Sequence, residues 1–306
     1  MILRDLGDVL SARLDEGTPG DPGLIGPDGQ VWRVAREKVV LAGGPAALLL
    51  QLAHPLVAAG VADHSEFESQ PLHRLAGTLT AVLTATFGDR HQAEAVGRRV
   101  AAVHTRVTGT LSVRTGPFPA GAPYRAADPD LALWIQATLV KVAIDIFDCF
   151  VEPLSHAERA QYYDQTKPIG RLFSVTDDVM PATYADFERY VDTMEHETLA
   201  VGDDARSAAA GVLRPKLGPA GWLARPLTRL LATAFLPDSL RAAYGLHWRR
   251  RERAAFAVTR ASIRTALAVL PGRWRYWPHE RTALDRVRQT AGTGTDAGTG
   301  ASRPTA

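Results

Sequence analysis

The stretch from Val39 to Ala62 holds no Asp, Glu, Lys or Arg, so any fold of this chain has to place a long uncharged segment out of water. A run of this length would span a bilayer as one helix, because about 20 apolar residues are enough. Gln51, His54 and Pro55 interrupt the run, however, and proline ends or kinks a helix. The sequence therefore predicts two core helices broken at Pro55, with a shallow, peripheral membrane contact as the open alternative.

The composition is that of an ordinary globular protein. Of the 306 residues, 46% are hydrophobic and 22% are charged, which excludes a chain that is disordered throughout. The 35 basic and 33 acidic residues nearly balance, so the strongly basic face of a nucleic-acid-binding protein is not expected. Cys149 is the only cysteine, hence no intrachain disulfide can form, and the N-terminus shows no secretion signal. We therefore expect a cytoplasmic protein that binds no nucleic acid.

Apolar residues recur at helical spacing along most of the chain, and no segment alternates with the period of two that marks a strand. This pattern predicts an all-α fold, with a single large helical domain over residues 20–287. Residues 1–19 are expected to form an N-terminal helix or arm. The tail over 288–306 is rich in Gly and Thr, and its low complexity predicts disorder.

Two of the expected helices, over 71–87 and 92–109, are joined by a short turn. Arg74 lies about fifteen residues before the centre of this turn, and His104 lies about fifteen after it. At 1.5 Å per residue both are about 22 Å from the turn, so an antiparallel helix pair places them side by side. Thr78 is four residues after Arg74 and shares its face. Arg74, Thr78 and His104 can therefore converge on one pocket.

A lone histidine between apolar helices is a standard axial ligand of haem iron, and an arginine beside it can pair with a haem propionate. The sequence lacks the signatures of other common sites: it has no GxGxxG, Walker, HExxH or GxSxG motif, and no pair of Glu-x-x-His strings for a di-iron centre. Spacing alone leaves a plainer interpretation open. In it, His104 is a core histidine, Arg74 reaches solvent along its own helix, and Thr78 bonds to its own backbone.

A series of short motifs makes this site more specific. In chain order they are His54-Pro55-x4-Gly60-Val61-Ala62-Asp63-His64-Ser65-x-Phe67, Pro71-x2-Arg74-Leu75-x2-Thr78, Phe87-Gly88, Val103-His104-x2-Val107-x-Gly109 and Tyr124-x3-Asp128-Pro129-x4-Trp134. Together they resemble the MpaB-type oxygenase family, which is related to the latex-clearing protein, a rubber oxygenase. The resemblance covers about residues 35–200 and extends loosely to the helices beyond.

The resemblance implies an all-helical fold with haem b in a central pocket and oxygen-dependent chemistry on hydrophobic substrates. In the rubber oxygenase pattern an Arg-x2-Lys-Thr string precedes the proximal histidine. Arg74 matches the arginine, Thr78 the threonine and His104 the proximal iron ligand, although the spacing from arginine to histidine is a few residues shorter here. The chain departs from the pattern at Gly77, where the family has a lysine that can occupy the sixth iron position. Gly77 therefore implies an iron that is five-coordinate, water-bound or capped by another side chain.

His54 and His64 are the candidates for a distal group that polarises bound oxygen. Pro55 is expected to kink the helix just after His54 and so to place its ring in a cavity. Asp63 is expected to orient His64 by a hydrogen bond. The alternative for both histidines is that their rings satisfy backbone groups freed by the kink. Cys149 is a further candidate iron ligand, against the simpler interpretation of a buried cysteine.

These residues predict a haem b-dependent oxygenase, or a related oxidoreductase, that acts on a small hydrophobic or amphipathic substrate with dioxygen. His104 would hold the iron, and Arg74 and Thr78 would contact the cofactor or the bound oxygen. Two alternatives stay open. One is a haem-binding sensor or carrier without turnover, and the other is a haem-free helical protein that binds lipid or another protein.

Overall fold

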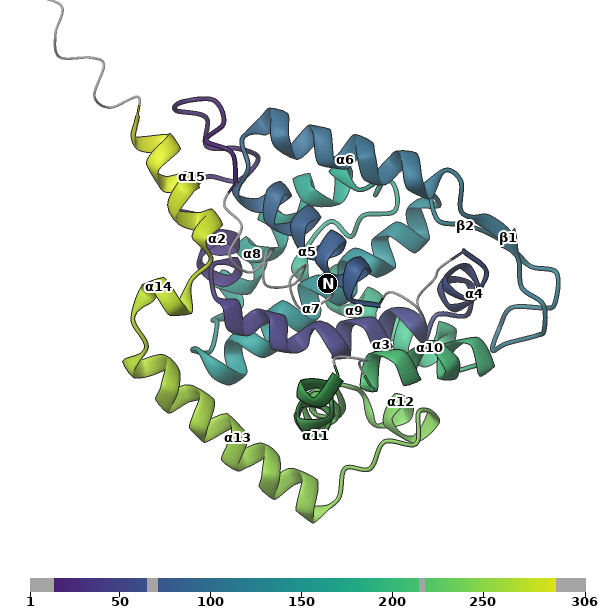
Figure 1. Ribbon diagram of the computed structural model, residues 1–306. Coiled ribbons are helices and arrows are strands. Elements are labelled where there is room, and N and C mark those ends of the chain that lie inside the picture. The colour runs from purple at the N-terminus through teal and green to yellow at the C-terminus, as the bar shows by residue number, and fades with distance from the viewer. Residues whose placement is uncertain (1–13, 65–70, 215–217, 290–306) are drawn as a thin grey trace, which may run out of the picture.

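The computed structural model describes residues 14–64, 71–214 and 218–289, with the side chains of 71–76 and 218–223 outside the description (Figure 1). The low-complexity tail expected at the C-terminus lies outside the described residues from position 290 onward. The first part of the expected N-terminal arm lies outside them too.

Helices make up most of the described chain, as the sequence predicts. In chain order they are α2 (Gln30–Ala35), the 3-10 helix η1 (Lys38–Gly43), α3 (Gly44–Leu52), α4 (Pro55–His64), α5 (Pro71–Phe87), α6 (Arg90–His104), α7 (Pro129–Phe150), α8 (His156–Leu172), α9 (Tyr184–Thr193), the π-helical turn η2 (Met194–Thr198), α10 (Asp203–Leu213), α11 (Gly218–Ala234), α12 (Asp238–Ala243), α13 (Arg250–Val269), α14 (Gly272–Arg275) and α15 (Pro278–Arg288). Figure 1 shows α13 and α15 at one edge of the molecule, with the remaining helices packed beside them.

A two-stranded antiparallel hairpin interrupts the helices. Its strands are β1 (Thr108–Thr110) and β2 (Pro123–Arg125), and Gly109 pairs with Tyr124 in the register. The hairpin projects at the edge of the molecule opposite α13 and α15 (Figure 1). Three-residue strands are too short to show a clear alternation in the sequence, so the sequence gives no sign of this hairpin, and the all-α class stands.

The helix expected over 92–109 is shorter than predicted, because α6 ends at His104. Thr105, Val107 and Thr108 follow that residue, and β-branched side chains lower helix propensity while they favour strands. The apolar spacing of the segment therefore continues past the true end of the helix. His104 is consequently the last residue of α6 and lies beside the hairpin, not in the middle of a helix.

Helix α7 forms the centre of the core. It begins with Pro129 in the first turn, and the Asp128 carboxylate accepts the backbone N–H of Asp130 at 3.0 Å, as expected of a helix cap. Trp134 and Phe147, both about 1% exposed, are among its many buried side chains. Helices α2, α3, α8 and α13 and the 3-10 helix η1 pack around α7. The core of the protein is therefore built on one apolar helix of 22 residues.

The uncharged run forms the predicted pair of helices. Helix α3 ends at Leu52, α4 begins at Pro55, and the two are bent by 102°. Leu49 and Leu50 are fully buried against the core. Among the described helices, none alone is long and apolar enough to cross a membrane, and this bent pair meets the criteria of length and composition only when its two parts are taken together.

The segment that precedes α2 is held against the turn between α5 and α6. Asp89 caps α6 and accepts the backbone N–H of Thr18 at 2.7 Å. Arg286 of α15, about 1% exposed, donates to the carbonyl oxygens of Asp21 at 2.8 Å and of Phe87 at 3.0 Å. Because Arg286 is buried with these acceptors, it fastens the two ends of the described chain to the α5–α6 hairpin.

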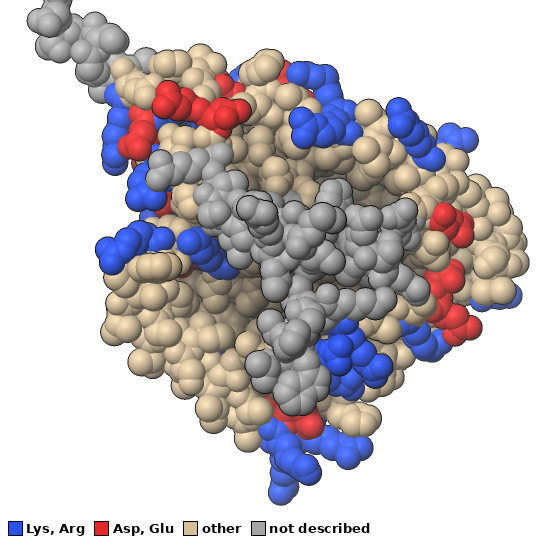
Figure 2. Space-filling model, in the orientation of Figure 1, with Lys and Arg blue, Asp and Glu red and all other residues tan. Residues whose placement is uncertain are grey.

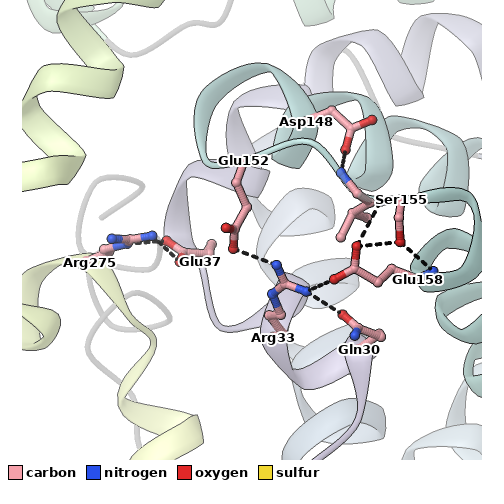
Figure 3. Close-up of polar contacts among 9 residues, drawn as sticks. Gln30, Arg33, Glu37, Asp148, Glu152, Ser155, Glu158 and Arg275 are labelled. Carbon is pink, nitrogen blue, oxygen red and sulfur yellow. Dashed lines mark hydrogen bonds and ion pairs between the residues drawn. The ribbon is translucent and has the colours of Figure 1, made fainter.

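Charged side chains join the N-terminal helices to later parts of the chain (Figure 3). Arg33 of α2 binds Glu152 at 2.7 Å and Glu158 at 2.5 Å. Glu37, about 1% exposed, receives two hydrogen bonds of 2.7 Å from the guanidinium group of Arg275 in α14. A two-point pair of this kind fixes orientation as well as distance.

Candidate functional site

The helical hairpin that carries three predicted site residues is present. Helices α5 and α6 pack together through a small apolar cluster around Ala81, Ala85 and Val96, and the turn between them consists of Gly88 and Asp89. Alanines at the contact allow the two helix backbones to approach closely. The packed pair of helices that the sequence predicts is therefore present.

Each of the predicted residues can be placed on this hairpin. Arg74 lies in the first turn of α5, and its side chain is outside the described residues. Thr78 lies one turn further on and is exposed, and His104 is the half-buried last residue of α6. Gly77 of α5 is exposed, and an added Cβ atom there would meet no atom of the described residues within 4 Å. Of these residues, Thr78 and Gly77 are exposed and His104 is half-buried.

His54 lies at the break between α3 and α4 and is buried, with 4% of its surface exposed. Its Nδ1 accepts the backbone N–H of Leu56 at 3.3 Å, a helix-capping role for a ring nitrogen. Burial lowers the pKa of His54 from 6.5 to about 4, although the charge of Asp128 opposes this shift. The ring packs against Phe118, with centroids 5.3 Å apart. His54 is therefore neutral at pH 7, and its remaining proton is on Nε2.

His64 has a different environment. It is exposed, and its Nε2 donates to the carbonyl oxygen of Thr108 in β1 at 2.8 Å. The expectation that Asp63 orients His64 is wrong: the Asp63 carboxylate instead accepts the Tyr124 hydroxyl at 2.6 Å. Neighbouring residues on a helix point about 100° apart, so Asp63 and His64 reach different partners. Both partners belong to the β-hairpin, so the end of α4 serves to hold that hairpin.

The two candidate distal histidines are far apart. His54 directly precedes α4 and His64 ends it, so the two are ten positions apart along the chain. At 1.5 Å per residue their backbones are about 15 Å apart. The two rings therefore cannot face the same small ligand. Of the two, only His54 lies in the core.

Contacts between α3 and α7 form an apolar wall next to His54. The Trp134 ring nitrogen donates to the carbonyl oxygen of Leu50 at 3.3 Å, and Gln51 donates to the Thr138 hydroxyl at 2.9 Å. These bonds satisfy the polar atoms of otherwise apolar helices. The wall of α3 that leads to His54 is consequently fixed in position relative to α7.

Cys149 is half-buried near the end of α7, and its carbonyl oxygen accepts hydrogen bonds from Arg260 and Arg264, each at 3.2 Å. Burial raises the pKa of the Cys149 thiol, although the two arginines oppose this shift. The thiol form is therefore favoured at neutral pH. This environment agrees with the simpler interpretation of Cys149 as a packed cysteine, since an iron ligand has to be a thiolate.

The described residues offer no ready-made site for a bare metal ion. Within them, no group of three or more His, Cys, Asp or Glu side chains could hold a metal ion. A haem iron needs only one or two protein ligands, because the porphyrin supplies four nitrogen atoms. His104 is the half-buried last residue of α6, and Gly77 on α5 is exposed.

Comparison with known proteins identifies the family. Residues 32–265 match the family described as ER-bound oxygenase mpaB/B'/Rubber oxygenase, catalytic domain. The chain therefore belongs to this family of oxygenase catalytic domains, and the resemblance carried by the short motifs is confirmed.

Two mycobacterial proteins are similar to the chain. They are the uncharacterized protein Mb2261 of Mycobacterium bovis and the uncharacterized protein Rv2237 of Mycobacterium tuberculosis. Each is 26% identical over 238 residues, which cover 75% of this chain and 89% of the relative. No solved structure matches the chain.

Proposed function

We propose that this chain is a haem b-dependent oxygenase that acts on a small hydrophobic or amphipathic substrate, with His104 as the iron ligand. Membership of the family supports an oxygenase. The observation that carries the cofactor assignment is the α5–α6 hairpin, which sets the positions of Arg74 and His104 about equally far from the turn. A haem held there would supply the chemistry that oxidises a C=C or C–H bond with dioxygen.

In this proposal α5 contributes the polar contacts of the cofactor. Arg74 pairs with a propionate, because guanidinium–carboxylate bonds are strong and directional. Thr78 is exposed one turn away, and its hydroxyl can both donate and accept a hydrogen bond. The lysine of the rubber oxygenase pattern has no counterpart here, because Gly77 stands at its position and has no side chain that could contact the cofactor.

Of the two histidines that could polarise bound oxygen, His54 is the better candidate, because its side chain is buried and that of His64 is exposed. Its pKa of about 4 keeps the ring neutral at pH 7, and the bond from Leu56 to Nδ1 leaves the proton on Nε2. His54 would therefore orient a polar ligand by donating from Nε2, while the apolar wall of α3 and α7 excludes water. His64, which is exposed and bound to β1, would act on the cofactor pocket only by holding the β-hairpin.

The test compares two histidine variants of one helix. Haemin is titrated into the wild-type protein, His104→Ala and His91→Ala, since His91 is exposed in the first turn of the same α6. We expect about one haem b per chain for the wild type and His91→Ala. His104→Ala should bind haemin at least tenfold more weakly, while its helical circular dichroism is unchanged.

The outcomes separate the alternatives. If His104→Ala keeps a full complement of haem, the ligand assignment is wrong. If none of the three proteins binds haemin, the cofactor proposal fails, while the family assignment stands. A wild-type protein that binds haem but consumes no oxygen with any alkene or fatty acid would favour the sensor or carrier.

A further inference from the structure

A surface cavity of about 550 Å³ lies between α10, α11 and the residue that follows α12, at a place that the proposed function does not use. Four arginines line it: Arg206 and Arg214 from α10 and its end, and Arg225 and Arg229 from α11. Figure 2 shows basic side chains gathered over α10 and α11. A volume of this size is typical of sites for small ligands.

The arginines of this cavity are poorly neutralised by the protein. Residues 205–237 contain no Asp or Glu at all. Arg206 pairs with Asp203 at 3.0 Å on the exposed surface. Within the described chain, no carboxylate lies within 4.0 Å of the guanidinium groups of Arg214, Arg225 or Arg229. Like charges held around one cavity repel each other, and an anion that enters relieves this repulsion.

The rest of the lining is apolar and fixed. Leu213, Ala209 and Pro226 lie between the arginines. The ring of Tyr244 forms a further wall, and its hydroxyl donates to the carbonyl oxygen of Leu49 in α3 at 2.8 Å. Because Leu49 is fully buried, this bond anchors the Tyr244 ring to the core. The cavity therefore combines a rigid apolar surface with a ring of positive charge.

We propose that this cavity binds a small anionic amphiphile: a phosphate or carboxylate head held by Arg214, Arg225 and Arg229, with a short apolar chain against Leu213 and Tyr244. Arginine suits both kinds of head because its planar group donates two parallel hydrogen bonds to either. The charge of the lining excludes cationic ligands, and its apolar part favours a ligand with a hydrocarbon chain over a bare anion. This inference does not depend on haem.

The test uses the full-length protein and defined probes. Octyl phosphate, octanol and inorganic phosphate are titrated by calorimetry into the wild type, Arg225→Gln and Arg253→Gln. Arg253 is an exposed arginine of α13 outside the cavity, so its variant matches the change in charge. Sedimentation with phosphatidylglycerol and phosphatidylcholine vesicles distinguishes a free amphiphile from a lipid head in a membrane.

We expect octyl phosphate to bind at least tenfold more tightly than octanol or inorganic phosphate. Arg225→Gln should weaken it about tenfold, because a charge-assisted bond is lost, and Arg253→Gln should change it less than twofold. The protein could instead bind phosphatidylglycerol vesicles but not octyl phosphate, with vesicle binding abolished by Arg225→Gln. That result would support recognition of an anionic head group and identify its source as a membrane lipid. The proposal would be overturned if Arg225→Gln and Arg253→Gln lost affinity for octyl phosphate equally, or if no anionic probe bound to the wild type.

Discussion

The hydroxyl oxygen of Tyr124 lies 2.6 Å from a carboxylate oxygen of Asp63, and this bond joins the end of α4 to strand β2. The Tyr124 ring also covers Gly109 of β1, where an added Cβ would lie 2.3 Å from the hydroxyl oxygen. The hairpin begins four residues after His104. The Tyr124–Asp63 bond is therefore one of the contacts that hold the hairpin which follows the proposed iron ligand.

Substitution of Gly109 tests this packing. Gly109→Ala forces the Tyr124 side chain away, and we expect a loss of about 2 kcal/mol in the free energy of unfolding, as for other overpacked sites. The matched control is Gly77→Ala, where the new methyl group meets nothing within 4 Å. Because alanine is favoured over glycine inside a helix, Gly77→Ala should raise the free energy of unfolding by about 0.5–1 kcal/mol. Urea denaturation measures both, and equal effects of the two variants would contradict the close contact.

The buried His54 should make stability depend on pH. Its pKa is about 4 in the folded protein and near 6.5 when unfolded, so the unfolded chain binds more protons between these values. The stability that His54 contributes is present above pH 6.5 and is lost as the pH falls toward 4. Between pH 7 and pH 5 this loss amounts to about 2 kcal/mol.

Urea denaturation of the wild type and His54→Gln at pH 7 and pH 5 measures this contribution. The variant should lose about 2 kcal/mol less than the wild type over this interval. Burial also lowers the pKa of His279 to about 4. The His279→Gln variant should therefore show the same reduced loss of stability between pH 7 and pH 5. Parallel pH profiles of variant and wild type would show that His54 is not buried as described.

The pair between Glu37 and Arg275 gives a prediction about charge (Figure 3). Because Glu37 is almost fully buried, Arg275→Ala leaves a carboxylate without its partner, and we expect a loss of about 3 kcal/mol. Arg189→Ala removes an exposed pair with Asp186 and should cost less than about 1 kcal/mol. Thermal and urea denaturation compare the two. Similar costs would mean that water screens the Glu37 carboxylate.

Restoring the lysine of the rubber oxygenase pattern tests the role of α5. The open space at Gly77 accommodates a long side chain, so Gly77→Lys should fold like the wild type. With haem bound, we expect the variant to show the absorption spectrum of a six-coordinate, low-spin iron, whereas Gly77→Ala should not. Identical spectra of the lysine and alanine variants would place Gly77 away from the iron.

Much of the fold follows from local signals in the sequence. Helix α5 spans Pro71–Phe87 as its apolar spacing predicts, and α7 begins directly after Asp128, a residue type that caps helices. Helix α8 likewise begins at a capping box, whose serine and glutamate, Ser155 and Glu158, are recognisable from their spacing in the sequence. Caps and periodicity act over a few residues, so they can be read without knowledge of the tertiary structure.

The parts that could not be predicted depend on contacts between distant segments. The partner of Asp63 is Tyr124, which is 61 residues away. Arg286 belongs to a helix, α15, that has few apolar residues and was not predicted, and it binds Asp21 across 265 residues. The basic cavity of α10 and α11 did leave a signal, the absence of acidic residues over 205–237, but only the fold brings its arginines together.

The central claim is that this oxygenase-family chain holds haem b, and the most direct test is the absorption spectrum of the purified protein with a pyridine haemochrome assay on the same sample. We predict a Soret band and about one haem b per chain, present on purification or gained from added haemin. A colourless protein that also refuses haemin would contradict the claim and leave a helical oxygenase-family domain that works without haem.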